Sequence, residues 1–405
     1  MIPRRWAFTL PNEFTRLRQW CDSEAALDDG LVRAWEAAVA GYVGMPHAAA
    51  VNSGRYGMTL IFEHLGVGEG DEVIVPAYTL KDLVPLVQAL GARAVAADVD
   101  PGTLNVTRES VAARLTARTR AILALHAFGN PAPVREVAAL ADERGVAVIE
   151  DCAHSLGAAL DGVQTGSFGY AGFYSFEPTK PINTYGGGMV VSRDEGLIAR
   201  IRESTREKPL DLDTLKTKAA TVKKEQFMMG TGLAWPILAA MANPVVKELI
   251  ARRYRSAQSV PSSAFRYAPP QAKLGLEKLE GLAERLEARR ACAALLREAL
   301  HDSIAVQKVA DNAQSTWYFF IALLPGGAAR ARARLILRGV DAAVEEEIAD
   351  DVGSMLGQED CLNAAEAYRR AIALPLFDGM TERQVRRVAR AVNRIATQSE
   401  QAGPG

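Results

Sequence analysis

Short apolar runs alternate with amphipathic stretches between residues 31 and 206. The apolar runs predict buried strands at residues 48–51, 72–75, 94–99, 121–125, 147–149 and 172–176. Apolar residues at helical spacing predict helices at 31–42, 58–65 and 134–144. Strands that alternate with helices in this way favour an α/β fold, with a mostly parallel sheet that helices cover on both faces.

Polar residues follow three of these predicted strands. Ser53 and Gly54 come just after the first strand, Asp151 follows the strand at 147–149, and Ser175 lies near the end of the strand at 172–176. Ligands of parallel sheets bind at the carboxyl ends of the strands. We therefore expect these residues to converge at one edge of the sheet.

The composition changes after residue 207. Residues 208–226 are polar and rich in lysine, residues 226–246 contain no charged side chain, and residues 261–270 form a connector with prolines and serines. The pattern then predicts a helix at 274–300, a strand at 316–323 and a basic amphipathic helix at 381–395. We predict an N-terminal arm (1–30), a large α/β domain (31–255) and a smaller α+β domain (256–405).

The uncharged segment 226–246 is long enough to span a bilayer. Gly230, Gly232 and Pro236 interrupt it, which argues against a simple transmembrane helix. We favour a buried insert or a dimer contact. The alternative is peripheral docking on a membrane or on a lipid-linked substrate, since Phe227 and Trp235 suit a membrane interface.

The overall composition excludes several classes of protein. The 405 residues include 47 Lys and Arg and 48 Asp and Glu. This balance lacks the excess of basic residues that is typical of nucleic-acid-binding proteins. The four cysteines form no Cys-x-x-Cys pair, so neither a metal site nor a disulfide framework is indicated. The first residues lack the apolar run of a secretory signal. We expect a cytoplasmic protein, with membrane association only through 226–246.

The most informative residue is Lys180, in the sequence Ser-Phe-Glu-Pro-Thr-Lys at 175–180 and shortly before the glycine run 186–188. A lysine amine can form an imine (Schiff base) with pyridoxal 5′-phosphate. The hydroxyl of Ser175 and nearby backbone amides would bind the phosphate, and Asp151 would pair with the pyridine nitrogen. A solvated surface lysine is the alternative, but the neighbouring residues favour the cofactor.

Three further residues admit both a structural and a functional interpretation. Asp151 could be the N-cap of a helix rather than the partner of the ring nitrogen. His154 could be a core histidine rather than a contact of the cofactor ring. His126 follows the strand at 121–125, where a structural role or a place in the pocket wall is favoured over metal binding.

Ser53, Gly54 and Arg55 lie between a predicted strand and a predicted helix. Backbone amides at the start of a helix bind phosphate, and an arginine adds a bidentate cation. An ordinary serine N-cap would give the same local pattern. The segment therefore supports a phosphate site only in combination with Lys180 and Asp151.

Four stretches together resemble the DegT/DnrJ/EryC1/StrS family of sugar aminotransferases, namely residues 70–77, 148–153, 166–169 and 175–189. The resemblance implies the fold type I of pyridoxal-phosphate enzymes, with a seven-stranded sheet in the large domain. It also implies a homodimer with active sites at the subunit interface. By resemblance, Lys180 forms the imine, Asp151 contacts the pyridine nitrogen and His154 lies on the ring-hydroxyl side. Ser175, Gly54 and Arg55 then bind the phosphate.

The chain departs from the family pattern at several positions. Arg55 replaces the usual threonine, and Leu80 stands where an aromatic residue usually stacks on the cofactor ring. Tyr78 is a candidate to take over that stacking. Ala264 replaces an asparagine, and the Gly-Glu-Gly-Gly of many members becomes Tyr185-Gly186-Gly187-Gly188. These changes weaken the prediction of the family's usual nucleotide-sugar substrate more than the prediction of the cofactor.

The sequence thus predicts a pyridoxal-phosphate-dependent aminotransferase. By resemblance, glutamate would donate the amino group, and the acceptor would be a keto-sugar or a similar polyol-like metabolite, with a lipid-linked form as one option. Lys180, once released from the cofactor, would move the proton between substrate and cofactor carbons. Elimination at the same imine is one alternative, and a cofactor-binding regulatory protein without turnover is another.

Overall fold

The computed structural model describes residues 1–240, 264–325 and 327–401, and its centre is a seven-stranded sheet. Every strand of this sheet runs parallel to the others except β10, which is antiparallel to both of its neighbours. The prediction of a mostly parallel α/β sheet is therefore confirmed. In spatial order the strands are β1 (His47–Val51), β10 (Gly188–Ser192), β9 (Ala171–Ser175), β6 (Ala147–Asp151), β5 (Thr119–Leu125), β2 (Glu72–Pro76) and β4 (Arg93–Ala97).

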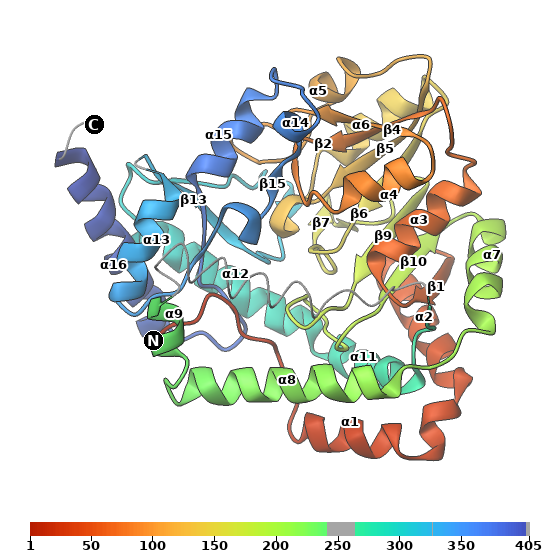
Figure 1. Ribbon diagram of the computed structural model, residues 1–405, viewed down its shortest axis with the longest axis horizontal. Helices are drawn as coiled ribbons and strands as arrows, with labels where there is room; N and C mark the ends of the chain where they lie inside the picture. Colours follow the sequence, from red (N-terminus) through yellow and green to blue (C-terminus); the bar gives the residue numbers. More distant parts are fainter. Residues whose placement is uncertain (241–263, 326, 402–405) are drawn as a thin grey trace.

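Helices cover both faces of this sheet (Figure 1). Leu123 packs toward α3, α4 and α7, whereas its neighbour Ile122 packs toward α5 and α6. Strands buried on both faces explain why the sequence shows continuous apolar runs. The covering helices are α2 (Asp29–Val43), α3 (Gly54–His64), α4 (Leu83–Ala89), α5 (Arg108–Ala112), α6 (Val134–Asp142) and α7 (Glu195–Arg206).

A second, antiparallel sheet of four strands follows later in the chain. Its strands are β11 (Ala305–Val306), β13 (Phe320–Leu323), β16 (Ala371–Leu374) and β14 (Ala343–Val344), with α13 (Ala328–Leu337) and α16 (Glu382–Gln401) packed beside them. The helices α14 (Val352–Met355) and α15 (Leu362–Arg370) precede β16 in the sequence. The predicted domain boundary at residue 255 lies outside the described residues.

Two short sheets link early and late segments of the chain. In one, β12 (Ala313–Gln314) pairs with β7 (Ala159–Leu160), which also pairs with β8 (Val163–Gln164). In the other, β15 (Asp350–Asp351) pairs with β3 (Tyr78–Thr79). The later segments are thereby hydrogen-bonded onto loops at the carboxyl edge of the large sheet.

Several predicted elements differ from the observed ones. The helical character expected at 274–300 is confirmed, but the stretch consists of two helices, α11 (Pro269–Glu280) and α12 (Leu282–Ala299). They are separated at Gly281, whose backbone leaves the helical conformation. The strand expected at 316–323 is confined to β13, because residues 315–319 fold over the carboxyl edge of the large sheet. Strand β10 was not predicted at all.

The lysine-rich segment forms a helix, α8 (Leu212–Gly230), which packs against α1 (Glu13–Cys21). Figure 1 shows α8 beside α1 and α11, leading to α9 (Trp235–Ala240) near α13. Phe227, Leu233 and Trp235 are 64%, 60% and 41% exposed, so this described part of 226–246 is not buried within the chain, and the expected dimer contact stays a prediction. None of the described helices combines the length and the apolar character that crossing a bilayer requires.

The N-terminal segment ties the two large sheets together. Ile2 pairs with Val340, and Arg4 forms an ion pair of 2.8 Å with Asp341 beside the four-stranded sheet. Farther along, Glu13 accepts a hydrogen bond of 2.8 Å from the fully buried Lys278. We call residues 4–13 the N-terminal strap. It connects the four-stranded sheet to the loop that follows Lys180.

Candidate active site

The polar residues predicted to converge do lie at the carboxyl edge of the large sheet. Ser53 forms a β-bridge with Gly187, and Gly188 pairs with both Val51 and Ser175. Asp151 is the last residue of β6, one strand away from β9. The convergence follows from topology, because β10 enters the sheet at the edge where its parallel neighbours end.

Glycines leave a close-packed backbone cradle at the start of α3. A Cβ atom on Gly188 would lie 2.5 Å from the Gly54 nitrogen, and one on Gly54 would lie 3.0 Å from the Tyr174 carbonyl oxygen. The Ser53 hydroxyl accepts a hydrogen bond of 3.1 Å from the Tyr56 amide, so this serine does serve as the helix N-cap. The remaining first-turn amides have no partner within the helix, and such amides can bind an anion.

Lys180 lies on a turn between β9 and β10. Its amide donates a hydrogen bond of 2.9 Å to the Glu177 carbonyl, and its side chain is half-buried. Tyr185, with φ of 62°, and the glycines at 186 and 187 return the chain to β10 through left-handed conformations. The Gln271 side chain donates to the carbonyls of Thr184 and Gly186, both at 3.1 Å, and holds this return in place.

The electrostatics of Asp151 and His154 are set by burial. Burial raises the pKa of the Asp151 carboxyl, while the Ala153 amide and the nearby Lys180 ammonium act in the opposite direction. Burial, with Lys180 nearby, also holds the pKa of His154 well below its usual 6.5. His154 is therefore a neutral imidazole beside a cation, and Asp151 is a carboxyl that a cationic partner would keep ionised.

Asp151 is not the N-cap of a helix. One of its carboxylate oxygens accepts a hydrogen bond of 3.0 Å from the Ala153 amide, but the residues after it form turns. The Nδ1 atom of His154 is buried and has no hydrogen-bond partner among the described residues. Buried polar atoms are nearly always paired in folded proteins, so this nitrogen is open to a ligand.

Tyr318 and Thr179 also belong to this site, although the sequence did not reveal them. The Tyr318 ring stacks on the His154 ring with centroids 4.1 Å apart, and the Lys180 Nζ lies 4.7 Å from the Tyr318 centroid. The hydroxyls of Tyr318 and Thr179 are 2.9 Å apart. Tyr318 lay within a predicted strand, and no local pattern placed it beside Lys180.

Three further predicted cofactor contacts differ in their surroundings. Arg55 is 53% exposed and forms an ion pair of 2.7 Å with Asp82. Leu80 is 41% exposed. Tyr78 is fully buried, and its ring packs edge-on against Phe128 at 5.9 Å between centroids. Their contacts with the cofactor remain predictions.

His126 is a structural residue paired with the buried carboxylate of Glu150. Its Nε2 lies 3.0 Å from a Glu150 oxygen, and its Nδ1 accepts a hydrogen bond of 3.0 Å from the Ala132 amide. Cys152 lies close enough to suggest a metal site with these two residues. Both ring nitrogens already have protein partners, so we assign no metal to this cluster.

Glu150 also fastens the loop 166–169. Its two carboxylate oxygens accept hydrogen bonds of 2.7, 2.8 and 2.8 Å from the amides of Gly166, Phe168 and Gly169. The side chain is fully buried, and charge-assisted hydrogen bonds to backbone amides stabilise such a carboxylate. This carboxylate explains why a loop rich in glycine holds one conformation directly behind Asp151.

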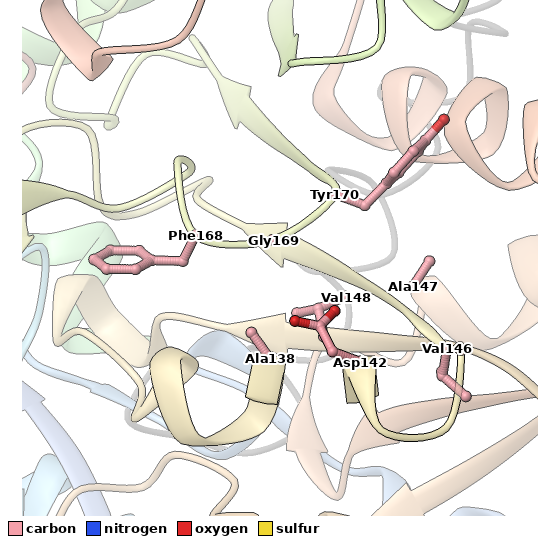
Figure 2. Close-up of a pocket in the computed structure, with 9 residues that line it drawn as sticks. Ala138, Asp142, Val146, Ala147, Val148, Phe168, Gly169 and Tyr170 are labelled. Carbon is pink, nitrogen blue, oxygen red and sulfur yellow. The ribbon is translucent and has the colours of Figure 1, made fainter. Parts of the chain in front are cut away.

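A cavity of about 390 Å³ lies at the opposite edge of the sheet, around the start of β6. Figure 2 shows Asp142 beside Val148, with Phe168 and Tyr170 pointing in opposite directions. The Tyr170 hydroxyl already donates to Asp194 at 2.6 Å. This cavity contains no lysine or histidine and is distant in topology from Lys180, so we do not treat it as the active site.

The residues at the carboxyl edge fit pyridoxal 5′-phosphate. They offer an amine on Lys180, a buried carboxyl on Asp151 and an unpaired ring nitrogen on His154. The first-turn amides of α3 have no partner within the helix and could bind a phosphate, and Ser175 pairs with Gly188 beside them. Lys180 would hold the cofactor covalently, and Asp151 would hold a proton on its pyridine nitrogen.

The neutral His154 predicts a specific dependence of stability on pH. The unfolded chain takes up a proton on this residue below about pH 6.5, whereas the folded chain does not, so stability falls as the pH drops. Between pH 6.5 and 5.5 the loss should be about 1 kcal/mol. Urea denaturation of the cofactor-free protein and of His154→Gln measures it. Equal losses in the two proteins would contradict the assignment.

Comparisons with known proteins agree with this geometry. The family model of the DegT/DnrJ/EryC1/StrS aminotransferase family matches residues 10–393. The solved aminotransferase TlmJ from Streptoalloteichus hindustanus has a TM-score of 0.77 at 25% identity, over 98% of this chain and 100% of that one. Structures of related sugar aminotransferases include a form with pyridoxal phosphate.

The chain matches about half of the length of two curated relatives. A UDP-N-acetyl-3-dehydro-α-D-glucosamine 3-aminotransferase of Acidithiobacillus ferrooxidans is 42% identical over 171 residues, which is 42% of this chain and 46% of that protein. A pleiotropic regulatory protein of Geobacillus stearothermophilus is 37% identical over 172 residues, with the same two shares. With the match across residues 10–393, these findings place the chain in the DegT/DnrJ/EryC1/StrS aminotransferase family, whose cofactor is pyridoxal phosphate.

Proposed function

We propose that this protein is a pyridoxal-phosphate-dependent aminotransferase that moves an amino group from an amino-acid donor, expected to be glutamate, to a keto-sugar. The observation that carries the proposal is the grouping of the Lys180 amine with the buried Asp151 carboxyl and the neutral His154 imidazole. Membership of an aminotransferase family supports the same reaction.

Each residue has a distinct task in this proposal. Pyridoxal phosphate, when bound, forms imines with amines and withdraws electrons from the adjacent carbon. Asp151 would keep a proton on the pyridine nitrogen, because its buried carboxylate needs a cationic partner. His154 would present a neutral nitrogen to the ring-hydroxyl side. The Lys180 Nζ would take the proton that leaves the substrate carbon and return it, as a general base and then a general acid.

The phosphate contacts of the proposal rest on the cradle at the start of α3. Gly54 and Arg55 lie in the first turn of α3, and their backbone amides would bind the phosphate. The Ser175 hydroxyl would add one hydrogen bond. Because the Arg55 guanidinium is paired with Asp82, Arg55 would contact the phosphate mainly through its backbone amide.

A keto-sugar is the acceptor that the comparisons favour. The curated relative from Acidithiobacillus ferrooxidans is named for a 3-dehydro sugar linked to UDP, although the match spans less than half of its length. A lipid-linked acceptor remains a prediction from the uncharged segment 226–246. Screening UDP-linked and lipid-linked keto-sugars against the aminated enzyme would separate the two.

Half-transamination tests the reaction itself. The purified holoenzyme mixed with glutamate should lose its visible absorbance band, become the amine form of the cofactor and release 2-oxoglutarate in a one-to-one ratio. A keto-sugar should then restore the original spectrum. A protein that binds the cofactor without turnover would leave the spectrum unchanged, and an eliminase would release ammonia. Either result contradicts the proposal.

We also propose that the protein is a homodimer whose active sites lie at the subunit interface. Family membership supports this arrangement. Light scattering should give about twice the chain mass of 43.6 kDa. A mass equal to one chain at micromolar concentration would refute the dimer.

Cytoplasmic location with peripheral membrane contact is a further proposal. The cysteines at 21, 152, 292 and 361 are all free thiols, which suits a reducing compartment. The exposed Phe227, Leu233 and Trp235 near the exposed Lys223 and Lys224 support contact with anionic lipid. Flotation with vesicles of anionic phospholipid tests this contact, and absence of co-flotation removes it.

A further inference from the structure

Residues 315–319 cross the carboxyl edge of the large sheet in an unusual backbone conformation. Trp317 has φ of 50°, in the left-handed region that aromatic side chains rarely adopt. Such a conformation is unfavourable and persists only where the surroundings impose it. Strained residues of this kind concentrate at functional sites, which draws attention to the neighbouring Tyr318.

Hydrogen bonds hold this segment against the loops at that edge. The Thr316 amide and the Ser315 hydroxyl both donate to the Gly129 carbonyl, at 3.0 and 2.9 Å. The Thr316 hydroxyl donates to the carbonyl of His154 at 2.7 Å. A Cβ on Gly129 would lie 1.9 Å from that hydroxyl, so the segment fits the loop only because residue 129 is a glycine.

The Tyr318 side chain contacts both reactive groups of the site. Its ring is nearly parallel to the His154 ring, with an interplanar angle of 11°, and the Lys180 Nζ lies above it at 4.7 Å from the centroid. Its hydroxyl is 2.9 Å from that of Thr179, the residue before Lys180. The ring therefore fixes two side chains at once, and Thr179 fixes the ring.

We propose that Tyr318 is a positioning residue that holds the Lys180 amine and the His154 imidazole in a fixed relation. The inference rests on the proposed function of Lys180 and His154 and adds a residue that acts through them. A cation–π contact restrains the lysine ammonium over the ring face. Ring stacking restrains His154, so that its unpaired Nδ1 keeps one direction.

Competitive chemical labelling of lysines tests the proposal without relying on activity. The full chain, freed of cofactor by cleavage of the imine with hydroxylamine and then by dialysis, is treated with a trace of acetic anhydride. Mass spectrometry gives the labelling rate of Lys180 relative to Lys208. Lys208 is a suitable reference because its Nζ lies 4.3 Å from the Tyr56 ring centroid, outside the site. The labelling ratio should rise at least about threefold in Tyr318→Leu. Tyr56→Leu should change the ratio in the opposite direction.

A double-mutant cycle keeps the test valid if Tyr318→Leu fails to fold. Tyr318→Phe and Thr179→Val each remove the same hydrogen bond and keep the ring. Each should raise the labelling ratio slightly and by the same factor, and the double variant should match the single ones. Independent, multiplicative effects would overturn the role of the Tyr318–Thr179 contact.

Kinetics of the holoenzyme provide a second, separate readout. Tyr318→Leu should lower kcat for the glutamate half-reaction about tenfold with KM unchanged within about twofold, because a misplaced amine slows proton transfer and not donor binding. An unchanged labelling ratio in a folded Tyr318→Leu variant refutes the positioning role. If the wild-type enzyme shows no half-transamination, the proposed function fails, while the labelling result still decides the position of Lys180.

Discussion

Replacing Lys180 by alanine should lower the rate of amino transfer by at least about 10⁴-fold and abolish covalent attachment of the cofactor. The amine is both the point of attachment and the group that moves the proton, and general acid–base catalysis alone contributes about 10²–10⁴-fold. Single-turnover kinetics with glutamate measure the first effect. Mass spectrometry after borohydride reduction measures the second.

Lys218→Ala is the matched control for this prediction. Lys218 reaches the same turn from α8, where its Nζ lies 3.1 Å from a Glu177 oxygen, but it does not contact the Asp151 and His154 group in the described structure. This variant should retain activity within about threefold, as expected when a partly exposed ion pair is removed. If covalent cofactor persisted in Lys180→Ala and disappeared in Lys218→Ala, the anchor would be Lys218 and the assignment of Lys180 would be wrong.

Replacing Glu150 by alanine should destabilise the protein by about 4 kcal/mol. The change leaves three buried backbone amides, those of Gly166, Phe168 and Gly169, without an acceptor. It also removes the partner of His126 Nε2. Each unsatisfied buried donor costs about 1–3 kcal/mol, partly relieved if the loop opens to water. The shift of the guanidinium unfolding midpoint, converted with the measured slope, gives the loss.

Two variants sharpen this measurement. Glu143→Ala removes an exposed carboxylate at the end of α6 and should change stability by less than about 0.5 kcal/mol. Glu150→Gln keeps one acceptor oxygen and should lie between that control and Glu150→Ala. A loss below about 1 kcal/mol in Glu150→Ala would show that the loop 166–169 does not depend on this carboxylate.

The sequence predicted the parallel strands well because each is buried on both faces and appears as an unbroken apolar run. It missed β10, whose first residue is Gly188, because a glycine run suggests a turn rather than a strand start. The break at Gly281 was missed for a related reason. One glycine costs a helix only about 1 kcal/mol, so the helical pattern on both sides outweighed it.

The candidate site was predictable where local motifs mark it and not where long-range packing creates it. Lys180, Asp151 and His154 lie in short motifs, and the topology of the sheet brings them to one edge. Tyr318 reaches the same place through the left-handed conformation of Trp317 and through hydrogen bonds to residues more than 160 positions earlier in the chain. The spacing of residues in the sequence reveals neither the left-handed conformation nor these long-range hydrogen bonds.

The N-terminal strap limits how far the two sheets can separate. Arg4 is fastened beside the four-stranded sheet, and Glu13 is fastened to Lys278 and Tyr185 beside the loop after Lys180. A chain of this length spans at most about 30 Å when fully extended. While both anchors hold, the distance between them cannot exceed that length. The strap therefore sets an upper limit on how far Asp341 and Lys278 can move apart.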